Sequence, residues 1–217
     1  NAFGVFLSLI LLVEIYSIWF DQNNGTKNPE QVYSQRYQLS EKFKEEMKYE
    51  KFRVNSRDGS YMLFQRNQGF VDNIEFLEGY GALLLKNFIP PNGSDPKSSQ
   101  THDLMNVKYK IFSDSTGKGK ALGLNPTYLP RVMMFYDAVK FNTDEDVKKY
   151  MMSNEFNYRR TLVVEEKENI NLPKLNPADS VPVNTVKILE HSLNYMKVEV
   201  DTPQDGILYF SEVFYPA

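Results

Sequence analysis

The pattern of hydrophobic and polar positions divides the chain into an apolar N-terminal stretch and a mixed remainder. Residues Ala2 to Phe20 (AFGVFLSLILLVEIYSIWF) contain one charged side chain, Glu14. As a helix this stretch would rise about 28 Å, close to the roughly 30 Å thickness of the hydrocarbon core of a bilayer. After Asp21, polar and apolar residues alternate at the spacings typical of surface helices and half-buried strands.

Three interpretations of the apolar stretch compete. A secretory signal peptide starts with basic residues and ends at small ones, whereas this stretch has no preceding Lys or Arg and ends in bulky residues. A buried core helix is usually shorter and carries a polar stripe, which is absent here. A membrane span fits the length, and Tyr16 and Trp19 suit the aromatic belt at the membrane interface. We therefore expect a transmembrane helix over residues 1–20.

Glu14 and the first residue both indicate a larger protein. A carboxylate facing lipid is costly, so Glu14 is expected to face neighbouring helices of a bundle. The chain starts at Asn1 without an initiator methionine. We expect a piece of a longer protein, in which residues 1–20 are the last span.

Helical character is predicted from Glu30 to Glu50. Pro29 suits the first helical position, and Asn28 before it suits the N-cap. An interruption is expected near Ser40, whose hydroxyl would cap a second helix from Glu41 to Tyr49.

Strands and short helices are predicted for the rest of a mixed α/β domain over residues 21–165. The predicted strands are Lys51–Asn55, Tyr61–Gln65, Val107–Phe112, Arg131–Tyr136 and Thr161–Glu165, with a short helix over Thr101–Met105. The first two strands are expected to form a hairpin. Thr143 is expected to cap a helix between the last two, giving a strand, helix, strand unit.

The C-terminal part is predicted to be a separate β segment. Residues 166–182 combine charge with several prolines, which indicates a linker. In residues 183–217, three alternating strands (Val186–Glu190, Tyr195–Val200 and Gly206–Phe214) predict an antiparallel, sandwich-like meander that is incomplete at its end. The expected fold class is thus α+β: a transmembrane helix, a mixed α/β extracytoplasmic domain and this β segment.

Composition excludes several kinds of site. The net charge of −3 is spread along the 217 residues, so no basic face for nucleic acid is expected. The absence of cysteine excludes disulfides, thiolate zinc sites and a thiol nucleophile within this chain. The 14 tyrosines and 15 phenylalanines favour aromatic-rich β packing over a stacking platform for sugars or bases.

Neither the histidines nor the glycine-containing run Gly117 to Lys120 shows the pattern of a metal site or a phosphate-binding loop. The only two histidines, His102 and His191, lack metal-ligand spacing in their flanks, and His102 with Asp103 is interpreted as part of a helix start. The run Gly117 to Lys120 lacks the spacing and the following Ser or Thr of a phosphate-binding loop.

The charged clusters are explained by structural roles, and the glycosylation triplets are not taken as evidence of function. The acidic run Asp144 to Asp146 is explained by capping at a helix N-terminus. Arg159 and Arg160 could contact an anionic lipid headgroup but are more typical of a solvated turn. The triplets starting at Asn24 and Asn92 match the glycosylation pattern only in form. The sequence therefore nominates no catalytic, cofactor-binding or metal-binding residue, and no cofactor.

The order of several motifs resembles the C-terminal part of YfhO-like bacterial membrane proteins. After the apolar span the motifs are Leu77-Glu78-Gly79-Tyr80-Gly81, Leu104 to Tyr109, Leu129-Pro130-Arg131, Thr161 to Glu165 and Gly206 to Pro216. The chain departs from the family at Ala217, where the family usually has glycine. The resemblance implies a polytopic envelope protein similar to C-type glycosyltransferases, which use a polyprenyl-phosphate sugar to decorate cell-surface polymers. The catalytic acid of such enzymes is expected in an early loop outside this chain.

The expected function follows from the span and this resemblance. Residues 21–217 are expected on the extracytoplasmic side of a bacterial cell membrane, as a non-catalytic region that helps hold a polyprenyl-phosphate-linked sugar or an envelope polymer. A rival hypothesis is an interaction domain, anchored by a single span, that binds glycan or protein through aromatic residues. A third is a soluble hydrolase, which would need two carboxylates facing each other across a cleft.

Overall fold

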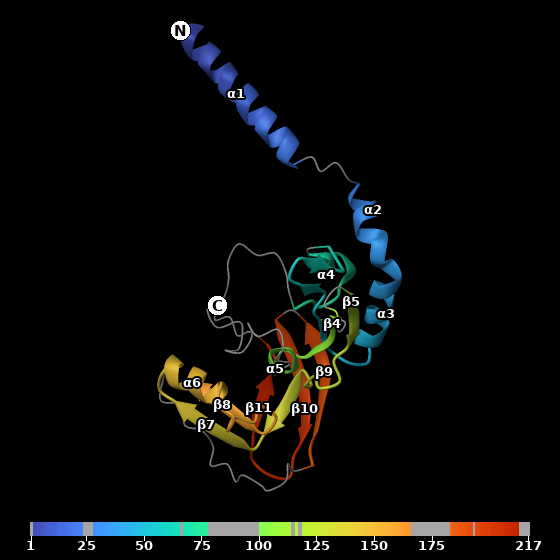
Figure 1. The fold of residues 1–217 in the computed structure, drawn as a ribbon, viewed down its shortest axis with the longest axis vertical. Helices are drawn as coiled ribbons and strands as arrows, with labels where there is room; N and C mark the ends of the chain where they lie inside the picture. The colour runs from blue at the N-terminus through green and yellow to red at the C-terminus, as the bar shows by residue number, and fades with distance from the viewer. Residues whose placement is uncertain are drawn as a thin grey trace.

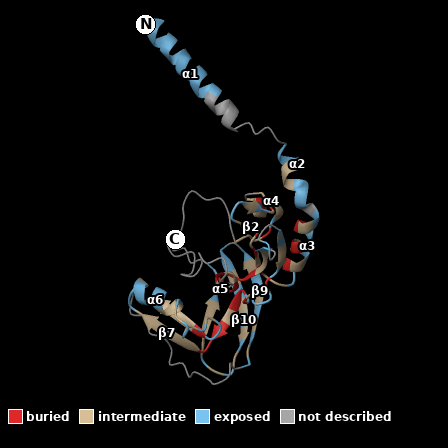
Figure 2. Ribbon diagram, viewed as in Figure 1, coloured by how far each residue is buried: buried red, intermediate tan, exposed pale blue. Residues whose placement is uncertain are grey.

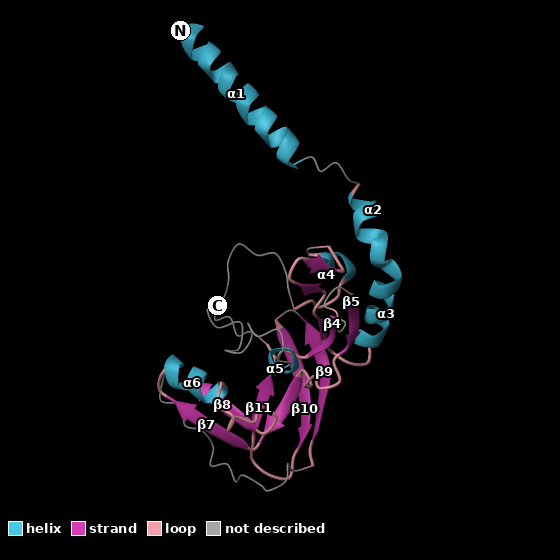
Figure 3. Cartoon of the chain, viewed as in Figure 1, coloured by secondary structure: helices cyan, strands magenta, loops and turns pink. Residues whose placement is uncertain are grey.

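The computed structural model has mixed α+β architecture, with helix and strand in equal shares of 34% (Figures 1 and 3). It describes residues 2–23 (side chains 2–17), 28–65, 67–77, 100–113, 116, 119–165, 183–192 and 194–212, without the side chain of residue 37. The α+β class expected from the sequence is confirmed. The expected linker over 166–182 and the motif residues Glu78 to Gly81 lie outside the described residues.

The described elements alternate along the chain. The helices are α1 (Ala2–Asn23), α2 (Pro29–Tyr33), the 3₁₀ turn η1 (Ser34–Arg36), α3 (Tyr37–Met47), α4 (Gln68–Asp72), α5 (Gln100–Leu104) and α6 (Asp144–Met151). The strands are β1 (Arg53–Val54), β2 (Arg57–Asp58), β3 (Tyr61–Met62), β4 (Val107–Ser113), β5 (Lys120–Leu124), β6 (Val132–Phe135), β7 (Asp137–Phe141), β8 (Thr161–Glu165), β9 (Thr185–Ser192), β10 (Tyr195–Asp201) and β11 (Ile207–Phe210).

The helix α1 stands apart from the folded part of the chain (Figure 1). Its apolar side chains are exposed, for example Phe3 at 77% and Val13 at 67%. Among the residues whose side chains are described, no helix has both the length and the apolar character needed to cross a membrane. The expected span over residues 1–20 stays a prediction, and Trp19 falls outside the described side chains.

The start of α2 agrees with the sequence prediction. The predicted break in the helical region at Ser40 does not. Asn28 caps α2, accepting a hydrogen bond at its Oδ1 from the Glu30 N–H at 2.9 Å, and Pro29 occupies the first turn. The break lies at η1, and Ser40 lies inside α3 instead of starting a new helix. The Ser40 hydroxyl is buried and donates to Asp72 Oδ2 at 2.6 Å, so a tertiary partner replaces the expected cap.

Strand β1 does not form the expected hairpin. It pairs in parallel with β4, which pairs on its other side with β5 in antiparallel fashion. The hairpin around Gly59 is shorter and joins β2 to β3. Gly59 has a φ of +59°, which glycine adopts without steric cost.

The strand, helix, strand unit is confirmed with a shifted first strand. Thr143 Oγ1 accepts from the Asp146 N–H at 3.1 Å and starts α6. The crossover joins β7 to β8 in parallel, while the predicted strand Arg131–Tyr136 corresponds to β6 just before β7.

The predicted C-terminal meander is wrong in its third strand. Strands β9 and β10 form the expected antiparallel pair, but β11 pairs with β6, with Ile207 opposite Phe135. This pairing ties residues assigned to the C-terminal β segment to the mixed domain before it. Gly206 allows the approach, because a Cβ there would lie 2.9 Å from the Phe135 carbonyl oxygen.

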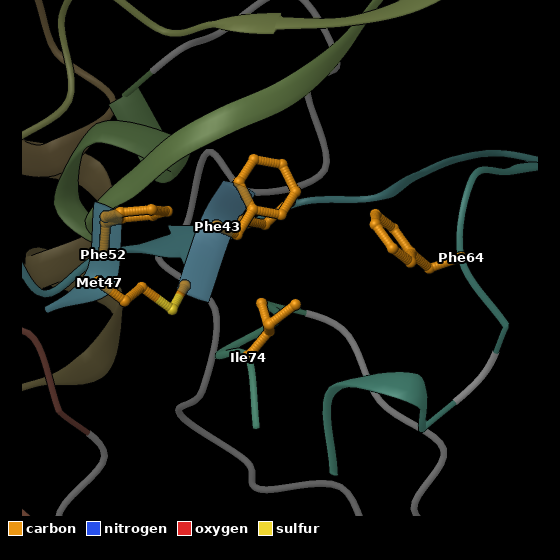
Figure 4. Close-up of a cluster of buried hydrophobic side chains, with 6 residues drawn as sticks. Phe43, Met47, Phe52, Phe64 and Ile74 are labelled. Carbon is orange, nitrogen blue, oxygen red and sulfur yellow. The ribbon is translucent and has the colours of Figure 1, made fainter. Parts of the chain in front are cut away.

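The main core lies between α3 and the β1-β4-β5 sheet (Figures 2 and 4). Its buried members are Phe43, Met47, Phe52, Val54, Phe64 and Ile74. Phe43 and Met47 form the helical face expected from their spacing of four. The Phe43 ring lies 6.4 Å from the Phe52 ring and 5.0 Å from the Tyr109 ring, so it is the centre of the cluster.

Replacing Phe43 with alanine should lower the free energy of unfolding by about 3–5 kcal/mol, because the lost ring leaves a cavity among aromatic neighbours. Chemical denaturation of wild type and Phe43→Ala measures the change. Tyr49→Ala is the matched control, since Tyr49 is 85% exposed at the end of α3 and its loss should cost under about 0.5 kcal/mol. Equal losses for the two variants would contradict this account of the core.

Candidate functional site

Five charged or ionisable side chains from distant segments meet in one group, called here the Arg131 cluster. Its members are Arg53 of β1, Glu75 after α4, Arg131 before β6, His191 of β9 and Glu212 after β11. Two carboxylates converge on the one arginine at its centre.

Arg131 is the centre of the cluster. Its side chain is 3% exposed, its Nε donates to Glu212 Oε1 at 2.6 Å, and its Nη2 donates to Glu75 Oε2. Its Nη1 lies 3.5 Å from Asn106 Oδ1. The planar guanidinium thus uses three nitrogens to reach three separate segments, which a lysine ammonium cannot reproduce.

Arg53 attaches the same cluster to β1 and α5. It donates to Glu212 Oε2 at 3.0 Å, to the Met105 carbonyl at 3.0 Å and to Ser211 Oγ at 3.2 Å. Burial, together with the positive charge of Arg131, lowers the pKa of Arg53. Glu212 balances both cations, since each of its oxygens accepts from a different arginine.

A bulge in β9 directs His191 toward the two carboxylates. Lys197 pairs with Glu190 and Val198 with Ile188, so Leu189 is an extra residue. Regular alternation from Ile188 would turn Glu190 inward; the bulge turns His191 inward instead. His191 Nδ1 lies 3.6 Å from Glu75 Oε1, and its Nε2 lies 3.8 Å from Glu212 Oε1.

A second group surrounds a fully buried carboxylate and is called here the Asp103 cluster. Asp103 Oδ1 accepts from Asn125 Nδ2 at 2.8 Å and Thr127 Oγ1 at 3.0 Å. Asp103 Oδ2 accepts from Tyr158 OH at 2.7 Å and Arg159 Nη2 at 3.2 Å. Four donors, one of them the cation Arg159, thus compensate the burial of this charge.

The contacts within these two clusters join segments that lie far apart in the sequence. The Glu75 and Glu212 carboxylates converge on Arg131, and each accepts a hydrogen bond from its guanidinium. Within the described ranges, no group of three or more His, Asp or Glu side chains could hold a metal ion. We therefore interpret both clusters as locks that join distant segments.

The two histidines considered and set aside in the sequence have separate surroundings. His102 Nε2 lies 2.7 Å from Asn55 Nδ2, and its buried Nδ1 has no hydrogen-bond partner among the residues that the structure describes. Burial lowers the pKa of His102, and the charge of Lys110 adds to this effect, while Asp103 opposes it. His191 belongs to the Arg131 cluster.

The structure also shows the contacts of the charged residues that the sequence analysis discussed. Asp146 belongs to the α6 cap, as expected. Arg159 was expected in a solvated turn, but it pairs with the buried Asp103 although its own side chain is 41% exposed. Lys120 pairs with Asp58 at 2.5 Å. Gly117 and the triplets starting at Asn24 and Asn92 lie outside the described residues.

Sequence reasoning missed Arg131 and Glu212 as cluster members and Asn106 as a partner of Arg131, although each lies in a stretch on which the sequence resemblance was based. Asn106 belongs to Leu104–Tyr109, Arg131 to Leu129–Arg131 and Glu212 to Gly206–Pro216. For Arg131, a charged residue before an apolar stretch was the available signal, since a buried charge requires partners. The partners themselves cannot be read from spacing.

No family model matches the chain, and neither a curated protein nor a solved structure matches it.

Arg131→Lys should lower the free energy of unfolding by about 1–3 kcal/mol, because one buried ammonium cannot replace the hydrogen bonds that three guanidinium nitrogens make to Glu75, Asn106 and Glu212. Urea denaturation measures the loss. Arg57→Lys serves as the control, because Arg57 is exposed and the exchange there should cost under about 0.5 kcal/mol. A wild-type midpoint for Arg131→Lys would show that the cluster is not a lock.

His102 should titrate below the ordinary value of 6.5, since burial disfavours its charged form. The unfolded chain then binds the proton first, so the stability that neutral His102 contributes is present above pH 6.5 and is lost as the pH falls through the folded-state pKa. Imidazole NMR titration of the two histidines, assigned with His102→Gln, measures the midpoint. A His102 midpoint at or above that of free histidine would contradict the burial.

Proposed function

We propose that residues 21–217 form the extracytoplasmic region of a polytopic bacterial membrane protein, anchored by α1. The region covers a membrane-embedded site that transfers sugar from a polyprenyl-phosphate donor to an envelope polymer. It contributes no catalytic residue; it helps hold the acceptor or the donor near the bilayer surface.

The observation that carries the proposal is the exposure of apolar side chains on every side of α1. Leu11, Leu12 and Val13 are successive residues, so they point in directions about 100° apart. They are 50%, 63% and 67% exposed. Leaving each in water would cost about 1.5–3 kcal/mol, which lipid contact removes. The 22 residues of α1 would span about 33 Å as a straight helix.

Charge near the end of α1 supports an outer location for the folded part. Lys27 and Arg36 are the only cations within about 20 residues after Phe20, whereas cytoplasmic flanks are enriched in Lys and Arg. Glu14 is the single carboxylate of the apolar stretch. In the proposed arrangement it faces neighbouring helices of the same protein, where a polar partner can compensate its burial.

The ordered motifs support the link to sugar transfer. Three stretches that resemble the YfhO-like family meet at Arg131, through its contacts with Glu212 and Asn106. If the motifs preserve this lock, their role is to hold the shape of the region. A region held in one shape suits a cover better than a flexible tether.

Sugar transfer should fall when the region is removed. Membranes containing the full-length protein are compared with membranes containing a version that lacks residues 21–217, using a polyprenyl-phosphate sugar and the isolated envelope polymer. We expect a lower transfer rate and a higher KM for the acceptor, because the cover holds it near the site. Unchanged transfer and unchanged acceptor KM would refute the proposed role.

A cysteine-accessibility control reports the location separately. The chain has no cysteine, so Ser60→Cys in the exposed β2–β3 turn and Ser8→Cys in α1 each introduce a single thiol into it. In cells with an accessible outer membrane face, an impermeant maleimide should label the Ser60→Cys variant and leave the Ser8→Cys variant unlabelled until detergent is added. Labelling of the Ser60→Cys variant only after lysis would place the region on the wrong side.

A further inference from the structure

Helix α4 has an inverted distribution of polar and apolar side chains. Gln68 is 1% exposed, whereas Phe70 is 85% exposed and Val71 is 62% exposed. A surface helix normally buries its apolar side chains and exposes its polar ones. The two exposed residues are adjacent and large, so together they form a small apolar patch, called here the Phe70 patch.

Buried hydrogen bonds hold α4 in this orientation. Gln68 Nε2 donates to the Tyr33 carbonyl at 2.8 Å and to Asp72 Oδ2 at 2.9 Å, and Gln68 Oε1 accepts from the Gln65 N–H at 3.1 Å. Ser40 donates to the same Asp72 oxygen at 2.6 Å. Rotating α4 to bury the patch would break these bonds.

The backbone of α4 is also closely packed at Gly69. A Cβ at Gly69 would lie 2.5 Å from the Ile74 carbonyl oxygen, so this side of α4 admits no side chain. The Ile74 N–H donates to the Gly69 carbonyl at 2.9 Å. The inward side is therefore closed, and the Phe70 patch can only face outward.

The patch belongs to the end of the folded part from which the chain leads to α1. Through Gln68 and Tyr33, α4 is bonded to α2, and α2 starts at Pro29 shortly after α1 ends at Asn23. Figure 1 shows α4 beside α3 at this end. Exposed Arg36, in η1, donates its Nε–H to the Leu63 carbonyl at 3.4 Å on the approach to α4 and adds a cation to this end.

We propose that the Phe70 patch docks on the bilayer surface, with Phe70 and Val71 at the boundary between headgroups and acyl chains. The inference rests on the proposed membrane attachment through α1. Two features favour lipid over a protein partner. The patch consists of two side chains, far below the roughly 1,000 Å² that a specific protein interface needs. A lipid surface has no minimum area, and α1 keeps it close at all times.

The contact would fix the orientation of the folded part above the membrane. A single anchoring helix does not by itself fix the orientation of the domain, while a second contact at α4 fixes it. Arg36 suits the same surface, because lipid phosphates accept hydrogen bonds from arginine. The proposed ligand is thus the surface of a bilayer that contains anionic phospholipid.

The test compares two probe positions on the full-length protein in vesicles of phosphatidylethanolamine and phosphatidylglycerol. Phe70→Cys and Tyr49→Cys each receive an environment-sensitive fluorophore, in a background where any cysteine outside this chain is replaced. Both native side chains are 85% exposed, but Tyr49 lies at the far end of α3 from α2. Spin-labelled lipids should quench the Phe70 probe and leave the Tyr49 probe bright, while aqueous iodide should quench only the Tyr49 probe.

The outcomes separate this inference from the proposed attachment. If iodide quenches both probes while the protein resists alkaline extraction from the vesicles, the protein is membrane-embedded and the docking of α4 is refuted. If alkaline treatment extracts the protein, the attachment fails and the docking fails with it. If neither quencher reaches the Phe70 probe, a protein surface covers the patch and the lipid assignment is wrong.

Discussion

The burial of one arginine constrains the whole folded part of the chain. The side chain of Arg131 is 3% exposed, and a buried guanidinium is tolerated only when its donors are paired. Its partners Asn106, Glu75 and Glu212 are separated from it by 25, 56 and 81 residues along the chain. Strand β6 therefore cannot take its place unless α5, the turn after α4 and the end of β11 take theirs.

The Asp103 cluster extends this constraint to the strand, helix, strand unit. Asn106 Nδ2 donates to the Leu129 carbonyl at 2.8 Å, and the Leu129 N–H donates to the Asp103 carbonyl at 3.1 Å, so the two clusters share a backbone link. Polar groups thus link the two clusters inside the folded part, while several apolar side chains of α1 and α4 are exposed. Water alone does not favour this distribution, whereas a bilayer next to both helices would.

Local signals identified elements well and their partners poorly. The caps at Asn28 and Thr143 depend on neighbours two or three residues away, so the sequence contains all that determines them. Ser40 carried the same cap signal, yet its hydroxyl bonds Asp72, which lies 32 residues away. Strands β1 and β11 were expected to pair with their neighbours in sequence. They pair with β4 and β6 because parallel pairing and sheet closure depend on distant segments.

The sequence by itself determined the apolar run of α1, the α+β class, the helical face of Phe43 and Met47 and the lack of cysteine chemistry, because each follows from composition or short-range periodicity. Only the tertiary structure decided that Glu75, His191 and Glu212 surround Arg131 and that α4 turns Phe70 outward. A bulge of one residue reverses which side chain faces inward, and a buried charge takes its partners from anywhere in the chain. Neither effect leaves a periodic signal in the sequence.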